Sequence, residues 1–159
     1  MIAPPQQHIE THRPWWLRKN IPPTSIPPTM KIELFAICDF AADYAGKLVV
    51  VGIFDSLNAH QVPVVHPNLS VAIKIRFIKI EEGEKKVRFS ISNADGGTVL
   101  PPIEMPITAH VPEDLPSATV NLVLNIGGIQ FANFGEHSVD LALDGRHEAS
   151  IPLFVRRIV

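Results

Sequence analysis

Hydrophobic and polar residues alternate over most of the chain after residue 30, which is the period of a half-buried β-strand. The clearest case is Val87, Phe89 and Ile91, which alternate with polar residues. Residues 103–111 and 120–126 repeat the pattern. No segment has a sustained helical period, so the pattern predicts an all-β protein.

Three runs depart from plain alternation and allow finer predictions. Residues 47–54 are apolar on both faces, which is typical of a central strand. Residues 69–80 change phase after Phe77, and a slip of one residue indicates a β-bulge. Pro106 lies out of phase with the apolar positions of 103–111, so that run is predicted to be an edge strand or to contain a bulge.

Turn residues separate these runs. Asp144-Gly145 lies between two alternating segments and predicts a type I′ hairpin, which needs a positive φ at both turn positions. Residues 93–97 and 127–128 are interpreted as further turns, and the charged residues 81–86 as the tip of a hairpin. The sequence therefore predicts a single antiparallel β-sandwich of immunoglobulin-like or Greek-key type, with about eight or nine strands. A barrel is the alternative architecture.

The first 29 residues differ in composition from the rest. They hold seven of the 15 prolines and no glycine, and proline fits neither a helix interior nor a central strand. We therefore expect residues 1–29 to form a disordered, proline-rich leader and residues 30–159 to form the β-sandwich domain. Because the strand pattern begins directly after Met30, translation from Met30 is an alternative that would remove the leader.

Composition excludes several classes of protein. No apolar run approaches the roughly 20 residues of a membrane span, and a net charge of −2 provides no basic field for nucleic acid. The single cysteine, Cys38, excludes a disulfide scaffold and a multi-cysteine zinc site, and its apolar surroundings predict core packing. We expect a cytoplasmic protein with no membrane or nucleic-acid partner.

No catalytic motif stands out along the chain. The chain lacks a Gly-x-Ser-x-Gly nucleophile motif and every glycine-rich phosphate-binding motif. The closest carboxyl pairs are Asp39 with Asp43 and Glu113 with Asp114. Asp39 and Asp43 fall in a segment interpreted as a polar loop, where aspartate usually caps or turns the backbone. We therefore assign no catalytic, cofactor-binding or metal-binding residue and expect no cofactor.

Histidine is the one metal-binding residue type in surplus, with seven in the chain. His60 and His66 fall in a predicted loop, and His110 marks a strand end. Together with Asp55 they could meet at one end of a sandwich and bind a metal. None of them forms a closely spaced pair of the kind that metal motifs use, so we interpret them as surface or strand-end residues.

Two stretches of the chain resemble a known family. The first reads Lys31-Ile-Glu-Leu-Phe-Ala-Ile-Cys-Asp-Phe40, then Gly46-Lys-Leu-Val-Val-Val-Gly-Ile-Phe-Asp55. The second has the form Gly-x-x-x-Val-x-Leu-x-Leu-Asp-Gly followed by Ile-Pro-Leu-x-Val, within residues 135–155. Over about residues 30–158 the chain resembles a family of small bacterial all-β proteins known only as a domain of unknown function. The resemblance implies a β fold and carries over no activity, cofactor or site residue.

Three functions are compatible with the sequence. The lack of a catalytic set and the free edges of a sandwich favour a non-catalytic module that binds a protein partner or self-associates through an edge strand. The alternative is a small-ligand module, for a sugar or a metal, that uses loops at one end of the sandwich and in which Tyr44 would contact a sugar. An enzyme is least favoured, because it would need a cleft with carboxyl groups of shifted pKa.

Overall fold

The computed structural model of this chain describes residues 29–159. The predicted leader, residues 1–29, falls almost entirely outside them. The described part consists of strands and one short 3-10 turn and has no α-helix, which confirms the all-β class. It accordingly offers no helix that could cross a membrane. The strands are β1 (Lys31–Tyr44), β2 (Lys47–Ile53), β3 (Ser56–Ala59), β4 (Val64–Ile78), β5 (Gly83–Asn93), β6 (Thr98–Ala109), β7 (Ser117–Phe131), β8 (Gly135–Leu143) and β9 (Arg146–Arg157), and the turn is η2 (Lys79–Glu81).

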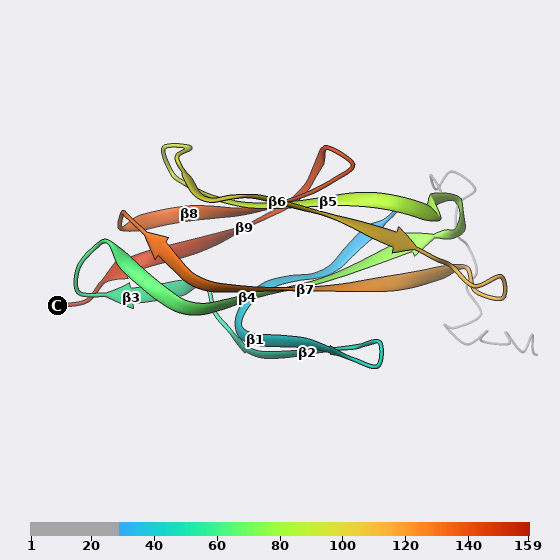
Figure 1. Cartoon of the computed structure of the whole chain (residues 1–159), viewed down its shortest axis with the longest axis horizontal. Coiled ribbons are helices and arrows are strands. Elements are labelled where there is room, and N and C mark those ends of the chain that lie inside the picture. The colour runs from blue at the N-terminus through green and yellow to red at the C-terminus, as the bar shows by residue number, and fades with distance from the viewer. Residues whose placement is uncertain (1–28) are drawn as a thin grey trace, which may run out of the picture.

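The strands form two sheets that lie one above the other (Figure 1). One sheet has the order β2-β1-β4-β7, and the other has the order β3-β9-β8-β5-β6. The second sheet curls as half a barrel. The expectation of purely antiparallel pairing was wrong in one place, because β3 runs parallel to β9.

The hydrophobic core lies between the two sheets. Phe77 of β4 and Phe131 of β7 meet Phe89 of β5, Leu141 of β8 and Leu153 of β9, and all five side chains are almost fully buried. Burial of a side chain of this size contributes roughly 1.5–3 kcal/mol. The alternation of apolar and polar residues therefore places one face of each sheet in a common core.

Two predicted features around β4 were wrong. The register between β4 and β7 continues without a shift to Ile78, so the change of phase is no β-bulge. The strand ends there and the chain enters η2, which leaves Ile80 80% exposed. Residues 81–86 are not the tip of a hairpin either, because β5 already begins at Gly83, and the short segment before it takes the chain from β4 in one sheet to β5 in the other.

The predicted turns have mixed outcomes. The hairpin at Asp144-Gly145 is confirmed, with φ values of 49° and 81° between β8 and β9. Residues 93–97 also connect a hairpin, formed by β5 and β6. Residues 127–128, in contrast, form no turn, since β7 continues through them to Phe131. β6 lies at the edge of its sheet, as the position of Pro106 predicts.

The strand β1 leaves its sheet halfway along. Its first half pairs with β4 as far as Cys38, opposite Ser70, and its second half pairs only with β2. The β1–β2 hairpin then lies against the face of β4 and β7 that points away from the second sheet (Figure 1). Asn121 of β7 donates hydrogen bonds to the Asp43 carboxylate, at 2.8 Å, and to the Gly46 carbonyl, at 3.0 Å. Because Asn121 is level with the start of β1, the hairpin has folded back on its own sheet.

A small apolar cluster holds the hairpin in this position. Its buried members are Cys38 and Ala41 of β1 and Ala72 of β4, and Val50 of β2 and Val123 of β7 pack around them. The expectation that residues 47–54 form a central strand was therefore wrong. β2 is an edge strand, which covers the outside of the sheet instead of lying within it.

Glycine is required at one position of the bend. Gly52 has a φ of 68°, and a Cβ atom there would collide with a carboxylate oxygen of Asp39. A side chain at this position would meet both a left-handed backbone and the Asp39 side chain. Gly46 in the hairpin turn has a similar φ of 77°, but a Cβ atom there would have no neighbour within 4 Å.

We predict that Gly52→Ala lowers the free energy of unfolding more than Gly46→Ala does. The left-handed backbone should cost each variant about 1–2 kcal/mol, and only Gly52→Ala also displaces Asp39. Urea denaturation of the two variants and the parent protein measures the difference. Equal losses at the two positions would show that the contact with Asp39 does not constrain the bend.

Candidate functional site

The β1–β2 hairpin presents the main exposed apolar surface of the four-stranded sheet. Val49, Val51 and Ile53 of β2 all project outward, and Ile53 is 63% exposed. Phe40 of β1, which is opposite Val51, is exposed beside them, and Tyr44 at the end of β1 is 73% exposed. Single exposed apolar residues are normal, but a contiguous group of them on one strand pair indicates an interaction surface.

The two aspartates of the predicted polar loop lie within β1 instead. Asp43 accepts a hydrogen bond from the backbone N–H of Gly46, at 2.9 Å, and another from Asn121. These bonds, that of Asn121 first, lower the pKa of the Asp43 carboxyl group. Asp43 therefore fixes the hairpin turn, in line with the capping role expected of it. Asp39 lies against Gly52, and neither carboxylate bonds to a histidine of the described residues.

The three candidate histidines do not converge. His66 packs edge-on against Phe54 at the beginning of β4, with ring centroids 5.5 Å apart. His110 lies beyond the other end of β4, where its Nδ1 atom is 2.6 Å from an oxygen of Glu82. His60 is exposed after β3. Within residues 29–159 no group of three metal-binding side chains is close enough to hold an ion.

Cys38 is buried, as its apolar surroundings predict. Its side chain is 0% exposed, and its thiol lies 3.6 Å from the Ser70 carbonyl oxygen, to which it donates a weak hydrogen bond. Burial raises the pKa of the thiol, which disfavours the reactive thiolate form. The residue belongs to the cluster under the hairpin and offers no nucleophile.

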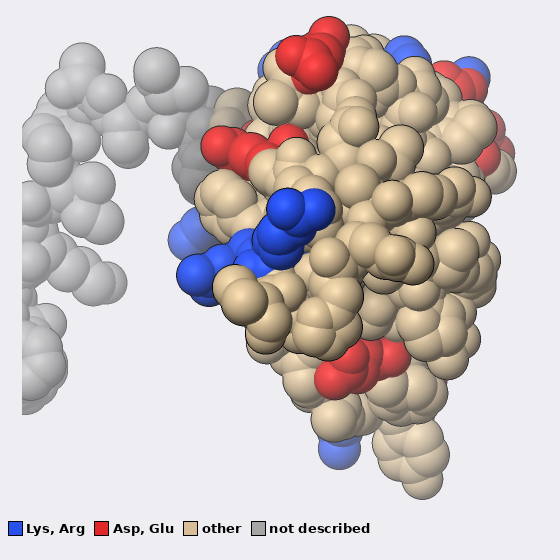
Figure 2. Space-filling view, turned by 90° about the vertical axis from the view of Figure 1, so that its left-hand side faces the viewer, with Lys and Arg blue, Asp and Glu red and all other residues tan. Residues whose placement is uncertain are grey.

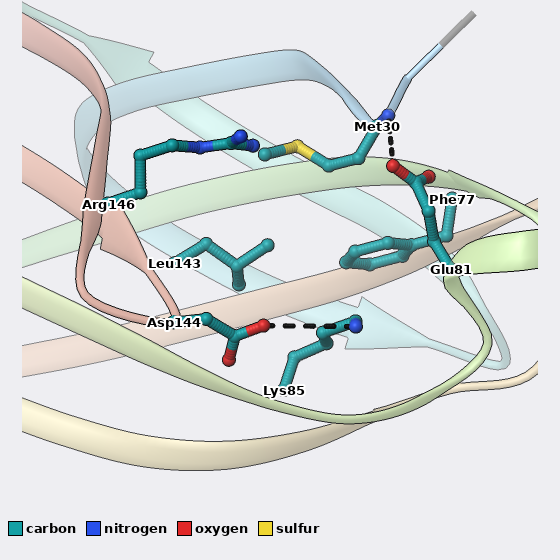
Figure 3. A pocket seen from close by; sticks show the side chains of 7 residues that line it. All are labelled: Met30, Phe77, Glu81, Lys85, Leu143, Asp144 and Arg146. Atoms are coloured by element: carbon teal, nitrogen blue, oxygen red, sulfur yellow. Dashed lines mark hydrogen bonds and ion pairs between the residues drawn. The ribbon is translucent and has the colours of Figure 1, made fainter. Parts of the chain in front are cut away.

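A first hollow, of about 310 Å³, lies where β1 begins (Figure 3). Leu143 and Phe77 lie between its charged side chains. Glu81 accepts bonds from the backbone N–H groups of Met30, at 2.8 Å, and Ile78, at 3.1 Å. The other ionic contacts are Lys85 with Asp144 and Arg146 with Glu148. These contacts connect the ends of neighbouring strands.

A second hollow, of about 300 Å³, lies beside the bend of β1. Asn68 and Ser70 of β4 and Asn125 of β7 line it on the outer face of the sheet, in the two rows that follow those covered by the hairpin. Asp39 and Phe40 line it from the bend. The Ser70 hydroxyl donates to the side-chain oxygen of Asn125, at 2.7 Å. Because the side-chain oxygen of Asn125 faces Ser70, the amide N–H groups of Asn125 point away from Ser70.

The sequence did not single out the polar residues of this second hollow. The polar phases of their strands contain Asn68, Ser70 and Asn125. Any solvent-exposed face of a sheet shows the same pattern. On β4 the outward positions 68 and 70 are both polar, but on β7 Asn125 stands between Val123 and Gly127, so the pattern along β7 does not mark a site. The sequence predicts a loop around Asp39, and only the bend of β1 brings this residue to the hollow.

Charged side chains form no extended field of one sign on the end of the molecule shown in Figure 2. Basic side chains lie in the middle of this face, with acidic side chains on both sides of them. A mixed distribution of this kind gives no long-range attraction for a strongly charged partner at this end.

Comparison with known proteins gives a family but no activity. Residues 33–156 match a family of unknown function, DUF6941, which confirms the resemblance to a domain of unknown function. No curated protein sequence matches the chain.

Two of the solved structures that are similar to this chain are parts of much longer proteins. The alkylpurine DNA glycosylase AlkC of Pseudomonas fluorescens, bound to DNA containing an abasic site analog, has a TM-score of 0.46 and 10% identity. The match covers 80% of this chain and 30% of that one. A β-glucosidase from Listeria innocua in complex with isofagomine has a TM-score of 0.43 and 11% identity, over 82% of this chain and 16% of its own. This chain spans less than a third of either protein, and these likenesses assign it no function.

We predict that the pKa of the Glu82 carboxyl group lies far below that of an ordinary glutamate. The ammonium group of Lys79, 2.9 Å away, contributes most, followed by the backbone N–H of Val111 and by His110, and together they lower the pKa of Glu82 from 4.5 to about 2. Since the folded state holds the lower pKa, Glu82 stabilises the fold above pH 4.5, and this contribution disappears as the pH falls through 2.

NMR titration of the Glu82 carboxyl carbon measures this pKa directly. Lys79→Ala should raise the pKa toward 4.5, whereas Lys47→Ala, which changes a lysine on the hairpin, should leave it unchanged. A carboxyl group of Glu82 that titrates near 4.5 in the parent protein would contradict the prediction.

Proposed function

The chain belongs to the family of unknown function DUF6941, and we propose that it is a non-catalytic, cytoplasmic interaction module that self-associates through β2. The observation that carries the proposal is a mismatch between composition and position. β2 has the apolar composition of a central strand but lies at the edge of its sheet. A second copy that pairs with β2 would supply the missing neighbour. The cytoplasmic location is supported by the single, unpaired thiol.

Of the features that usually prevent strand pairing, the edge of β2 has only a lysine at its start and the left-handed Gly52 near its end. Proteins protect free edges with proline, inward-pointing charges, bulges or very short strands. β6, at the edge of the other sheet, contains Pro101, Pro102 and Pro106, and β3 is only four residues long. β2 has seven residues, no proline and Lys47 as its one charge. Its backbone is therefore open to a further strand.

The chemistry of β2 favours an antiparallel second copy as the occupant. Pairing about Val50 would place Val49 of each copy opposite Val51 of the other, on the same face, and cross-strand pairs of this kind are stabilising. Lys47 at the start of the strand would lie near Asp55 of the other copy, just beyond its end. A parallel arrangement would bring the lysines together instead. Antiparallel pairing of two identical strands is also compatible with twofold symmetry, which is the commonest symmetry of homodimers.

We also propose a specific class for this fold. We class the two sheets as a β-sandwich of immunoglobulin-like or Greek-key type. Support comes from the connections, since the chain crosses between the sheets at β2–β3, β3–β4, β4–β5, β6–β7 and β7–β8. Crossovers between two sheets that share one core are typical of this class.

We predict that Val51→Lys converts a dimer into a monomer. The substitution places lysine in two symmetric valine pairs, each worth roughly 1 kcal/mol, so the dissociation constant should rise about 30-fold. Sedimentation equilibrium over a range of concentrations measures it. Val65→Lys is the matched control, because Val65 of β4 is 57% exposed and Val51 is 54% exposed.

Two results would contradict this proposal. One is a parent protein that stays monomeric at high concentration, which would leave β2 to a different partner. The other is an equal effect of Val51→Lys and Val65→Lys, which would indicate a general response to added charge. Hydrogen exchange gives a second readout, since the β2 amides that point away from β1 should exchange more slowly as the protein concentration rises.

A further inference from the structure

We propose that the hollow beside the bend of β1 binds a neutral, hydroxyl-rich ligand of the size of a single sugar ring. The hollow has about 300 Å³, at the small end of the roughly 300–1,000 Å³ found for ligand sites. It therefore suits one ring rather than an oligomer. This inference goes beyond self-association and does not depend on it.

The polar atoms of the hollow match the hydrogen-bonding pattern of a polyol. The Asp39 carboxylate offers acceptors, and the Asn125 amide offers donors because its oxygen is already bonded to Ser70. Among residues 29–159, no side chain or backbone group forms a hydrogen bond with the Asp39 carboxylate or the Asn68 amide. Each sugar hydroxyl both donates and accepts, so a pair of neighbouring hydroxyls could bond to acceptor and donor together.

The charge of the hollow argues for a neutral ligand. Asp39 is the one charged residue in its lining, and no lysine, arginine or histidine lines it. A phosphate or carboxylate would therefore meet a negative charge without a cation to balance it. A metal ion would need more anionic ligands than one carboxylate, and the described residues hold no cluster of metal-binding side chains.

The bend of β1 also supplies an apolar contact. Phe40 follows Asp39 directly and is 53% exposed where it lines the hollow. Sugar rings have apolar C–H faces as well as hydroxyl groups, so an aromatic residue beside carboxylate and amide groups suits them. The opposite wall contains Gly127, which has no side chain to narrow the hollow.

NMR titration with single sugars tests this inference. Glucose, galactose, mannose and N-acetylglucosamine are added separately to the full chain, and the amide signals of the protein are followed. At least one sugar should give saturable shifts at residues 39–40, 68–70 and 125–127. For a ligand of this size on an open surface, we expect a dissociation constant of roughly millimolar order.

Two substitutions should remove polar contacts of the hollow and preserve the fold. Asn125→Asp keeps the oxygen that accepts the Ser70 bond but loses the amide donors, and Asp39→Asn loses the charge but keeps the shape. Each variant should raise the dissociation constant for the sugar at least tenfold. Asn58→Asp, an exposed change of the same type on β3, is the control and should bind as the parent protein does.

Three results would overturn the inference. One is the absence of saturable shifts with all four sugars. Another is binding that both Asn125→Asp and Asp39→Asn leave intact, which would place it elsewhere. The third is saturable shifts at these residues with calcium chloride or methylammonium but with no sugar, which would replace the neutral ligand with a cation.

Discussion

The surface of this protein depends on one constraint, which is that β1 leaves β4 at Cys38 and folds back over only part of the outer face of its sheet. The hairpin covers the rows of Ala72 and Asn121 and leaves Asn125 and Asn68, in the next two rows, exposed. An isolated two-stranded hairpin is marginally stable in water. Its position therefore depends on the apolar cluster around Ala41 and on the hydrogen bonds of Asn121.

This incomplete cover has two consequences, one for each strand of the hairpin. Where the hairpin lies flat, β2 becomes an edge strand whose inner side chains pack on the sheet and whose outer valines face solvent. Where β1 bends, Asp39 is brought beside polar side chains of β4 and β7, and the hollow forms. The two proposals, self-association and binding of a sugar ring, therefore rest on different parts of one structural feature. Phe40 belongs to both surfaces, but the substitutions at Val51, Asp39 and Asn125 each change only one of them, so the two proposals can be tested separately.

The residues of the hollow show how far sequence reasoning extends to a site. Alternation places Asn68, Ser70 and Asn125 on the outer face of their strands, because side chains of a strand point in turn to its two sides. It does not show that the two strands are neighbours or that Asp39 reaches them. These facts depend on pairing between residues 55 positions apart, as in the bond between Ser70 and Asn125.

Local patterns were enough to predict the all-β class, the hairpin at Asp144-Gly145, the edge position of the strand that contains Pro106, and the burial of Cys38. Each of these follows from a property of a few neighbouring residues, such as the period of the side chains or the φ values that a residue tolerates. Long-range packing, in contrast, makes residues 47–53 an edge strand and ends a strand where the phase changes after Phe77. An apolar run has the same sequence pattern whether it packs beside a second strand or against the face of its own sheet, because both surroundings remove its side chains from water.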